Sequence, residues 1–349
     1  MADVPDGIRQ VLRAASRELL TRANVVATGV GYKVSAGART FDLSIVCSVS
    51  RKVPRALLAP GELVPPRLDG IPTDVIQIGP LRALQSRAGS YSPAPSSVLQ
   101  SRTGRYRPSP GGVSIGHRDI TAGTLGCMVK RDGQTLILSN NHVFANSNNA
   151  RIGDPILQPG PIDGGDLSEA HLANLLDFVP IRFSEPEPPS ECRFAQGVIA
   201  LLNAGCRILS SGTRYRIVRI QPEENLVDAA IAQPLKAEDV QDDVLEIGTI
   251  RGVVEARLGT AVRKSGRTTG VTSGEILQVD VTADVQYGQG RAARFTDQLL
   301  AGPMSQGGDS GSVVLDAENR LVGLLFAGSE NSTVINRIGH VFSALRLGL

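Results

Sequence analysis

The chain carries the stretch GDSGSVVL at residues 308–315. A serine between glycines, just before an apolar run that predicts a strand, is typical of a nucleophile on a tight loop. The glycines allow unusual backbone dihedrals and a close approach of substrate. The amides of Gly308 and Ser310 can then point together at one developing oxyanion. We therefore predict Ser310 as a nucleophile, with those two amides as an oxyanion hole.

Two upstream motifs provide partners for this serine. His142 lies in LSNNHVF, residues 138–144, and Asp228 lies in NLVDAAIA, residues 225–232. A serine hydroxyl needs a base within hydrogen-bond reach, and imidazole is the side chain that changes charge near neutral pH. A carboxylate on the other ring nitrogen fixes the tautomer. The order His, Asp, Ser is one of three in which this triad recurs, so we predict that His142, Asp228 and Ser310 act together.

At these motifs the chain resembles the chymotrypsin-like serine peptidases. A further stretch, KSGRTTG followed by GEI, is very similar to a second-barrel segment of the bacterial alpha-lytic type, and residues 338–349 resemble the closing C-terminal helix. The resemblance covers about 111–349. It implies a mainly β fold, a chymotrypsin-like double β-barrel with the first barrel at about 111–240 and the second at about 241–349.

The resemblance also suggests a substrate pocket. A residue about six before the serine often floors the primary pocket in this family, and here it is Met304. Gly328 matches a pocket-wall glycine, and Phe326, two residues before it, is also assigned to the pocket. An apolar floor predicts a medium-sized apolar residue before the scissile bond rather than lysine or arginine. Phe326 stands where relatives often have a serine that supports the catalytic aspartate, so Asp228 is expected to need another donor.

A second departure concerns Asp309. Secreted relatives neutralise the corresponding acid with a freshly cut N-terminus. Here Asp309 is expected either to find backbone amides or a nearby arginine, or to require activating cleavage in the linker. We favour constitutive assembly without cleavage.

Residues 1–82 are predicted to form a small N-terminal α/β domain. Apolar residues recur at helical spacing from Ile8 to Leu20, and three strands are expected at 25–34, 41–49 and 74–78. The arrangement resembles the N-terminal extension of some bacterial trypsin-like peptidases. This domain could inhibit, recruit substrate or oligomerise.

Two other segments stand apart. Residues 83–110 are rich in Ser, Arg and Pro and are predicted to be a linker, either a solvated tether or a cleavage or docking segment. Residues 195–209 have a helix-compatible pattern, an unusual helical insert in a first barrel. This insert could pack on the barrel or, like the N-terminal domain, support a homo-oligomer.

Composition limits the other possibilities. The chain has 36 basic and 34 acidic side chains, which argues against a nucleic-acid partner, and no apolar stretch is long enough to cross a membrane. The basic run at 263–267 is interpreted as a structural turn. The four cysteines, at 47, 127, 192 and 206, fit no zinc pattern, so no metal or cofactor is expected. Without a secretory signal, reduced thiols indicate a cytoplasmic location.

The sequence thus predicts a serine endopeptidase acting on protein or peptide substrates. Two alternatives remain open: a catalytically silent interaction protein with the same fold, and an esterase with the same triad. The intact triad counts against the first, and an open barrel cleft favours extended peptides over other esters.

Overall fold

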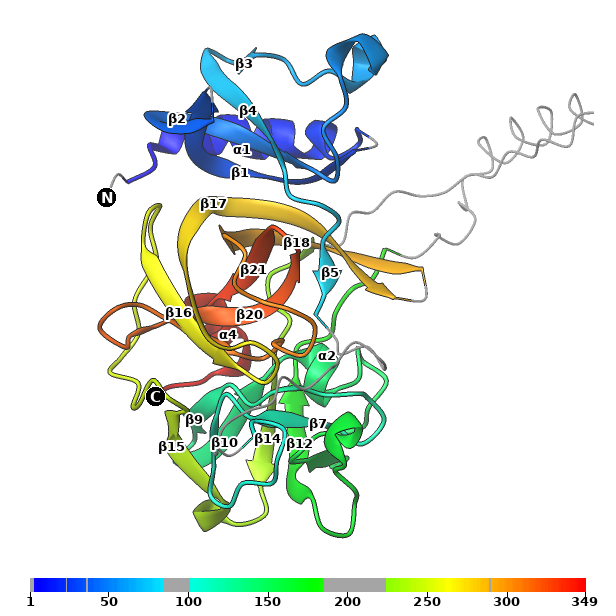
Figure 1. The fold of residues 1–349 in the computed structure, drawn as a ribbon, viewed down its shortest axis with the longest axis vertical. Coiled ribbons are helices and arrows are strands. Elements are labelled where there is room, and N and C mark those ends of the chain that lie inside the picture. Colours follow the sequence, from blue (N-terminus) through cyan, green and yellow to red (C-terminus); the bar gives the residue numbers. More distant parts are fainter. Residues whose placement is uncertain (1–2, 23, 36, 85–100, 185–223, 289) are drawn as a thin grey trace, which may run out of the picture.

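The computed structural model describes residues 3–22, 24–35, 37–84, 101–184, 224–288 and 290–349. Figure 1 shows three parts in a row along the long axis: an N-terminal unit at one end, followed by two β-rich bodies. The predicted helix at 195–209, with Cys192 and Cys206, lies outside the described residues, as do residues 85–100 of the predicted linker.

The N-terminal unit is a helix on a small mixed sheet. Leu12 and Leu19, two turns apart on the helix, are buried, and this apolar face contacts the first strand. The predicted helix and three strands are confirmed with small shifts in their ends. The elements are α1 Asp6–Leu19, β1 Val25–Ser35, β2 Ala38–Val49, β3 Arg67–Leu68 and β4 Ile71–Gln77, with short 3-10 turns at Arg55–Leu57 and Pro60–Glu62.

The first barrel is a seven-stranded sheet in the order β8-β7-β11-β12-β14-β10-β9. Its strands are β7 Ser114–His117, β8 Gly123–Thr124, β9 Cys127–Arg131, β10 Gln134–Ser139, β11 Pro155–Leu157, β12 His171–Phe178 and β14 Ala230–Pro234. The predicted hairpin between β9 and β10 is confirmed: Asp132 and Gly133 both have positive φ, as a two-residue turn of the hairpin type requires.

The second barrel belongs to a larger sheet. Its strands are β13 Glu224–Asn225, β16 Ala261–Gly266, β17 Gly270–Gly288, β18 Arg291–Ala301, β19 Val313–Leu315, β20 Leu321–Ser329 and β21 Ser332–Arg337. The predicted closing helix is present as α4 Ile338–Leu345, which buries Ile338, Val341 and Leu345. The fold is mainly β, a chymotrypsin-like double barrel.

The N-terminal unit continues the second-barrel sheet. Strand β1 pairs antiparallel with β17, in a register that places Ala27 opposite Ala283. A short strand, β5 Arg82–Ala83, then runs along the barrel and pairs with both β17 and β20 (Figure 1). Two sets of strand pairings, by β1 and by β5, therefore join this unit to the barrel.

Residues 101–110, which the sequence places in the linker, lie against the barrels. Strand β6 Ser109–Gly111 pairs with β15 Val240–Val244. Arg102 forms an ion pair of 2.9 Å with Glu246, and Arg107 donates to Gln158 Oε1 at 2.8 Å. This part of the predicted solvated tether is therefore held in place by specific side-chain contacts.

Candidate active site

His142 is positioned by a short helix, α2 Asn141–Phe144, which begins as strand β10 ends. The two asparagines before it hold this turn to neighbouring backbone. Asn140 donates to the carbonyl of Asp228 at 2.7 Å, and Asn141 donates to the carbonyl of Val179 at 2.8 Å. The imidazole is buried, with no exposed surface.

Asp228 lies two residues before the start of β14 and is also fully buried. Its Oδ2 is 2.6 Å from Nδ1 of His142, and its Oδ1 accepts the backbone N–H of His142 at 3.2 Å. Its own amide donates to Oδ1 of Asn336 at 3.2 Å. The structure therefore brings the predicted histidine and aspartate together in the geometry that orients an imidazole.

A third donor to this carboxylate, Tyr287, was not predicted. Its hydroxyl donates to Asp228 Oδ2 at 2.7 Å, and its ring meets that of His142 edge-on at 5.9 Å. Burial and the neighbouring Asp228 raise the pKa of Tyr287 well above its ordinary value, which keeps the hydroxyl protonated as a donor. The only sequence signal for it is the expectation, from Phe326, that Asp228 needs another donor.

Ser310 lies in a loop held to the first barrel by Thr124. The Thr124 amide donates to the carbonyl of Ser310 at 2.7 Å, and its hydroxyl donates to the carbonyl of Gly308 at 2.8 Å. Gly308 and Gly311 have φ of 100° and 94°, which L side chains rarely adopt. The predicted role of the glycines in shaping this loop is thus consistent with its backbone.

The structure has no hydrogen bond between Ser310 and His142. The Ser310 hydroxyl donates to the carbonyl of Phe326 at 3.0 Å. Nε2 of His142 is buried and has no hydrogen-bond partner among the described residues. The histidine–aspartate pair is therefore assembled while the serine hydroxyl is directed to another acceptor.

The predicted oxyanion donor Gly308 has an acceptor. Its amide donates to the carbonyl of Leu84 at 2.7 Å, and the Leu84 amide donates to the carbonyl of Phe326 at 3.2 Å. The Gly308 amide, which would donate to an oxyanion, thus donates instead to the carbonyl of the residue that follows β5.

Asp309 has permanent partners inside the barrel. Its carboxylate accepts the amides of Thr268 and Thr269 at 2.9 and 3.1 Å, and Nζ of the buried Lys264 lies 3.4 Å away. Burial lowers the pKa of Lys264, and Asp309 opposes that shift. Of the expected partners, the backbone amides are present; a lysine stands in place of the expected arginine.

The basic run at 263–267 has a structural role, but it is not the predicted turn: residues 263–266 lie in strand β16, and only Arg267 belongs to the turn that follows. Lys264 faces Asp309, and Arg267 forms a buried, two-point contact with Asp163. Lys264 and Arg267 are nearly or fully buried, and the half-buried Arg263 donates to Oδ1 of Asn319. This run therefore presents little charge to an external partner.

The predicted pocket residues divide into three cases. A Cβ at Gly328 would lie 3.4 Å from Cδ1 of Leu84, so Gly328 lies beside an apolar side chain. Met304 is buried in the same apolar cluster as Leu84. The Phe326 ring packs on Phe295 at 4.7 Å, so Phe326 contributes its carbonyl rather than its side chain.

No group of metal-ligating side chains is present within the described parts of the chain. His117, His171 and His340 each contact an aspartate or asparagine outside the site. A search of the same residues finds no helix long and apolar enough to span a membrane.

In fold, the chain resembles solved bacterial chymotrypsin-like serine proteases. Thermobifida fusca Protease A is 17% identical, with a TM-score of 0.43, over 69% of this chain and 97% of its own. A glutamic-acid-specific serine protease is 16% identical, with a TM-score of 0.44, over 69% of this chain and 100% of its own. A Cellulomonas bogoriensis chymotrypsin is 14% identical, with a TM-score of 0.41, over 69% and 97%.

No protein-family model matches the sequence, and no curated protein matches it either. Function is therefore inferred from this chain's own residues.

Proposed function

We propose that the protein is a serine endopeptidase in which Ser310, His142 and Asp228 form the triad. The observation that carries this proposal is the 2.6 Å contact between Nδ1 of His142 and Asp228, which leaves Nε2 buried and unpartnered among the described residues. A buried ring nitrogen without a partner costs about 1–3 kcal/mol. Such a cost is expected where the nitrogen is reserved for the proton of the Ser310 hydroxyl.

The reaction begins when the Ser310 side chain rotates from the Phe326 carbonyl toward His142. Oγ attacks the substrate carbonyl carbon, and its proton passes to Nε2. The oxyanion is stabilised by the amides of Gly308 and Ser310, each worth about 3 kcal/mol of barrier. The protonated imidazole is stabilised by Asp228, then gives its proton to the leaving amine as the C–N bond breaks. Water attacks the acyl ester in the reverse sequence and restores the serine.

Peptides are the favoured substrates because the site includes a strand edge. The backbone of β20 beside Ser310 pairs with an extended segment, at Ala327 and Gly328. Pairing with a strand edge recognises a peptide main chain, whereas a simple ester has no series of amides to pair. This contact favours the endopeptidase over the esterase alternative.

The compartment is also a proposal. Among the described residues Cys47 and Cys127 are free and buried, and burial raises the pKa of the Cys47 thiol to about 12. Unpaired thiols of this kind suit the reducing cytoplasm that the sequence suggested.

The test is labelling with a fluorophosphonate, mapped by mass spectrometry. An irreversible probe accumulates even at a site that opens slowly, so long incubations are informative. We expect an adduct on Ser310 in the native chain and none in Ser310→Ala, with a strong reduction in His142→Ala. A folded protein that gains no adduct after long incubation would contradict the proposal and favour the silent interaction protein.

A further inference from the structure

Residues 82–84 of this chain lie in the candidate active site as an added strand. Arg82 pairs with Gly328 and Ala83 pairs with Ala327, both antiparallel. On its other side the segment is held by β17, where the amide of Gln286 donates to the carbonyl of Leu81 at 3.0 Å. Figure 1 shows β5 leaving the N-terminal unit and running along the second barrel toward α2.

The backbone contacts of Leu84 place it at the reacting position. Its amide donates to the carbonyl of Phe326, which also accepts the Ser310 hydroxyl. Its carbonyl accepts the amide of Gly308 at 2.7 Å, within the range of an oxyanion-hole contact. Within residues 82–84, the carbonyl that accepts the Gly308 amide is that of Leu84.

The Leu84 side chain occupies an apolar site beside Gly328. It is 9% exposed, and Cδ1 lies 3.4 Å from where a Cβ on Gly328 would be. That same Cβ would lie 3.3 Å from the Ser305 hydroxyl, so a larger residue at 328 would crowd the space. A glycine here keeps room for a branched aliphatic side chain.

We propose that residues 82–84 are an internal inhibitor that fills the substrate strand of this site, with Leu84 in its primary pocket. The proposal rests on the peptidase function and names two properties of it. The intact N-terminal unit blocks the site in cis, and the pocket takes a leucine-sized aliphatic residue before the scissile bond.

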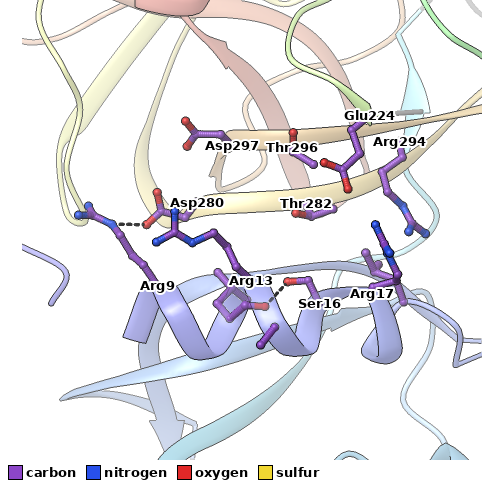
Figure 2. A pocket seen from close by; sticks show the side chains of 13 residues that line it. Arg9, Arg13, Ser16, Arg17, Glu224, Asp280, Thr282, Arg294, Thr296 and Asp297 are labelled. Atoms are coloured by element: carbon purple, nitrogen blue, oxygen red, sulfur yellow. Dashed lines mark hydrogen bonds and ion pairs between the residues drawn. The ribbon is translucent and has the colours of Figure 1, made fainter. Parts of the chain in front are cut away.

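The N-terminal unit keeps this strand at high local concentration. Strand β1 is part of the second-barrel sheet through β17, and Arg9 on α1 forms an ion pair of 3.0 Å with Asp280 on β17. Figure 2 shows Arg9 and Asp280 at the cleft of about 640 Å³ between α1 and the strands β17 and β18. A tethered segment has an effective concentration of the order of 1 mM, so a free peptide of similar affinity is excluded at lower concentrations.

The hydrogen bonding of the Ser310 hydroxyl is consistent with a blocked active site. The hydroxyl shares the Phe326 carbonyl with the Leu84 amide, and it makes no hydrogen bond to His142. A free substrate therefore needs both the strand to leave and the hydroxyl to rotate. Competition of this kind raises the apparent KM and leaves kcat nearly unchanged.

The experiment compares the full chain with Leu84→Glu and Leu84→Gly, using a peptide ending Arg-Ala-Leu before a fluorogenic amine. The first variant places a charge in the apolar pocket, and the second removes the side chain with no new charge. The matched control is Leu57→Glu, which makes the same change at a residue that is 75% exposed in the same unit. Intact mass confirms that each chain is uncut.

We expect both Leu84 variants to have an apparent KM about tenfold lower than the native chain, with kcat within about twofold, and Leu57→Glu to match the native chain. We also expect a matched peptide with lysine in place of leucine to be a poor substrate for the variants. Equal KM values in all four proteins would overturn the internal inhibitor while leaving the peptidase intact. No hydrolysis and no fluorophosphonate adduct in any of them would overturn the peptidase function, and the inhibitor with it.

Discussion

The hydroxyl of Tyr287 donates a hydrogen bond of 2.7 Å to Oδ2 of Asp228. The same oxygen faces Nδ1 of His142, so the tyrosine fixes the carboxylate that orients the imidazole. Tyr287 reaches this place from the end of β17, with its ring between those of His142, Phe183 and Phe295. The aromatic contacts hold the ring, and the hydroxyl holds the aspartate.

Tyr287→Phe keeps the ring and removes only that hydroxyl. A hydrogen bond to a charged acceptor is worth about 1.5–3 kcal/mol, so we expect kcat/KM to fall about tenfold or more. Steady-state kinetics on a peptide substrate, with thermal unfolding to confirm the fold, would measure it. Unchanged kcat/KM in a folded variant would mean that His142 and Asn336 suffice to hold Asp228.

The sequence predicted the triad because each member stands in a short motif at the end of a strand. His142 follows β10, Asp228 precedes β14 and Ser310 precedes β19. Local pattern and order along the chain are therefore enough to nominate these three residues as candidates. Their geometry relative to one another depends on contacts between distant parts of the chain, which a local pattern does not contain. The hydrogen bond from the Ser310 hydroxyl to the Phe326 carbonyl therefore had no signal in the sequence.

Tyr287 and Leu84 show what such a pattern omits. Tyr287 is 59 residues from Asp228, in a strand where its aromatic ring has the same sequence signal as any core residue. Leu84 ends a three-residue segment whose pairing partners lie more than 200 residues later, and it stands at the beginning of a Ser- and Arg-rich run. A strand this short, paired with residues this far away in the sequence, produces no hydrophobic periodicity that sequence analysis could detect.

Thr124→Val tests the contact that joins the first barrel to the nucleophile loop. The Thr124 hydroxyl donates to the Gly308 carbonyl and accepts the amide of Arg267 at 3.0 Å. Valine removes the hydrogen bond that the hydroxyl makes to each of these groups, which costs about 1–3 kcal/mol each, so we expect lower stability and reduced fluorophosphonate labelling. Thr124→Ser retains the hydroxyl and should remain close to native in both measurements. Equal effects of serine and valine would show that the methyl group, not the hydroxyl, matters.

Gly266→Ala tests the space around Asp309. A Cβ at 266 would lie 2.5 Å from Oδ1 of Asp309 and 2.8 Å from the Ser312 hydroxyl, so the loop must shift. We expect a loss of about 1–3 kcal/mol in unfolding free energy together with most of the activity. Gly339→Ala, in α4 with open space around it, should be neutral or slightly stabilising. Urea unfolding and labelling on both variants would separate the two, and a native-like Gly266→Ala would contradict this account.

Asp154 is expected to make stability depend on pH. The backbone amide of Arg151, 2.8 Å from its Oδ2, lowers the pKa of this carboxyl, with further help from His117. Because the folded pKa is below the ordinary value of about 3.9, the contribution is complete above that pH and is lost as pH falls through the folded pKa. The unfolding free energy of the native chain should therefore exceed that of Asp154→Asn by about 1 kcal/mol near pH 7, and by less near pH 3. Asp42→Asn, at an exposed position, should give no such change; a constant difference for Asp154 would contradict the assignment.

The buried pair of Lys264 and Asp309 is best tested by a double-mutant cycle. Lys264→Met leaves a carboxylate buried without its cation, which typically costs about 3–5 kcal/mol. Asp309→Asn leaves the ammonium in the same position without a carboxylate beside it, and the Thr269 hydroxyl and the Gly270 carbonyl remain as acceptors among the described residues. The double variant should be less destabilised than the sum of the single ones by about 1–3 kcal/mol, since neither buried charge then lacks its partner. Additive losses in urea unfolding would show that the amides of Thr268 and Thr269 neutralise Asp309 without the lysine.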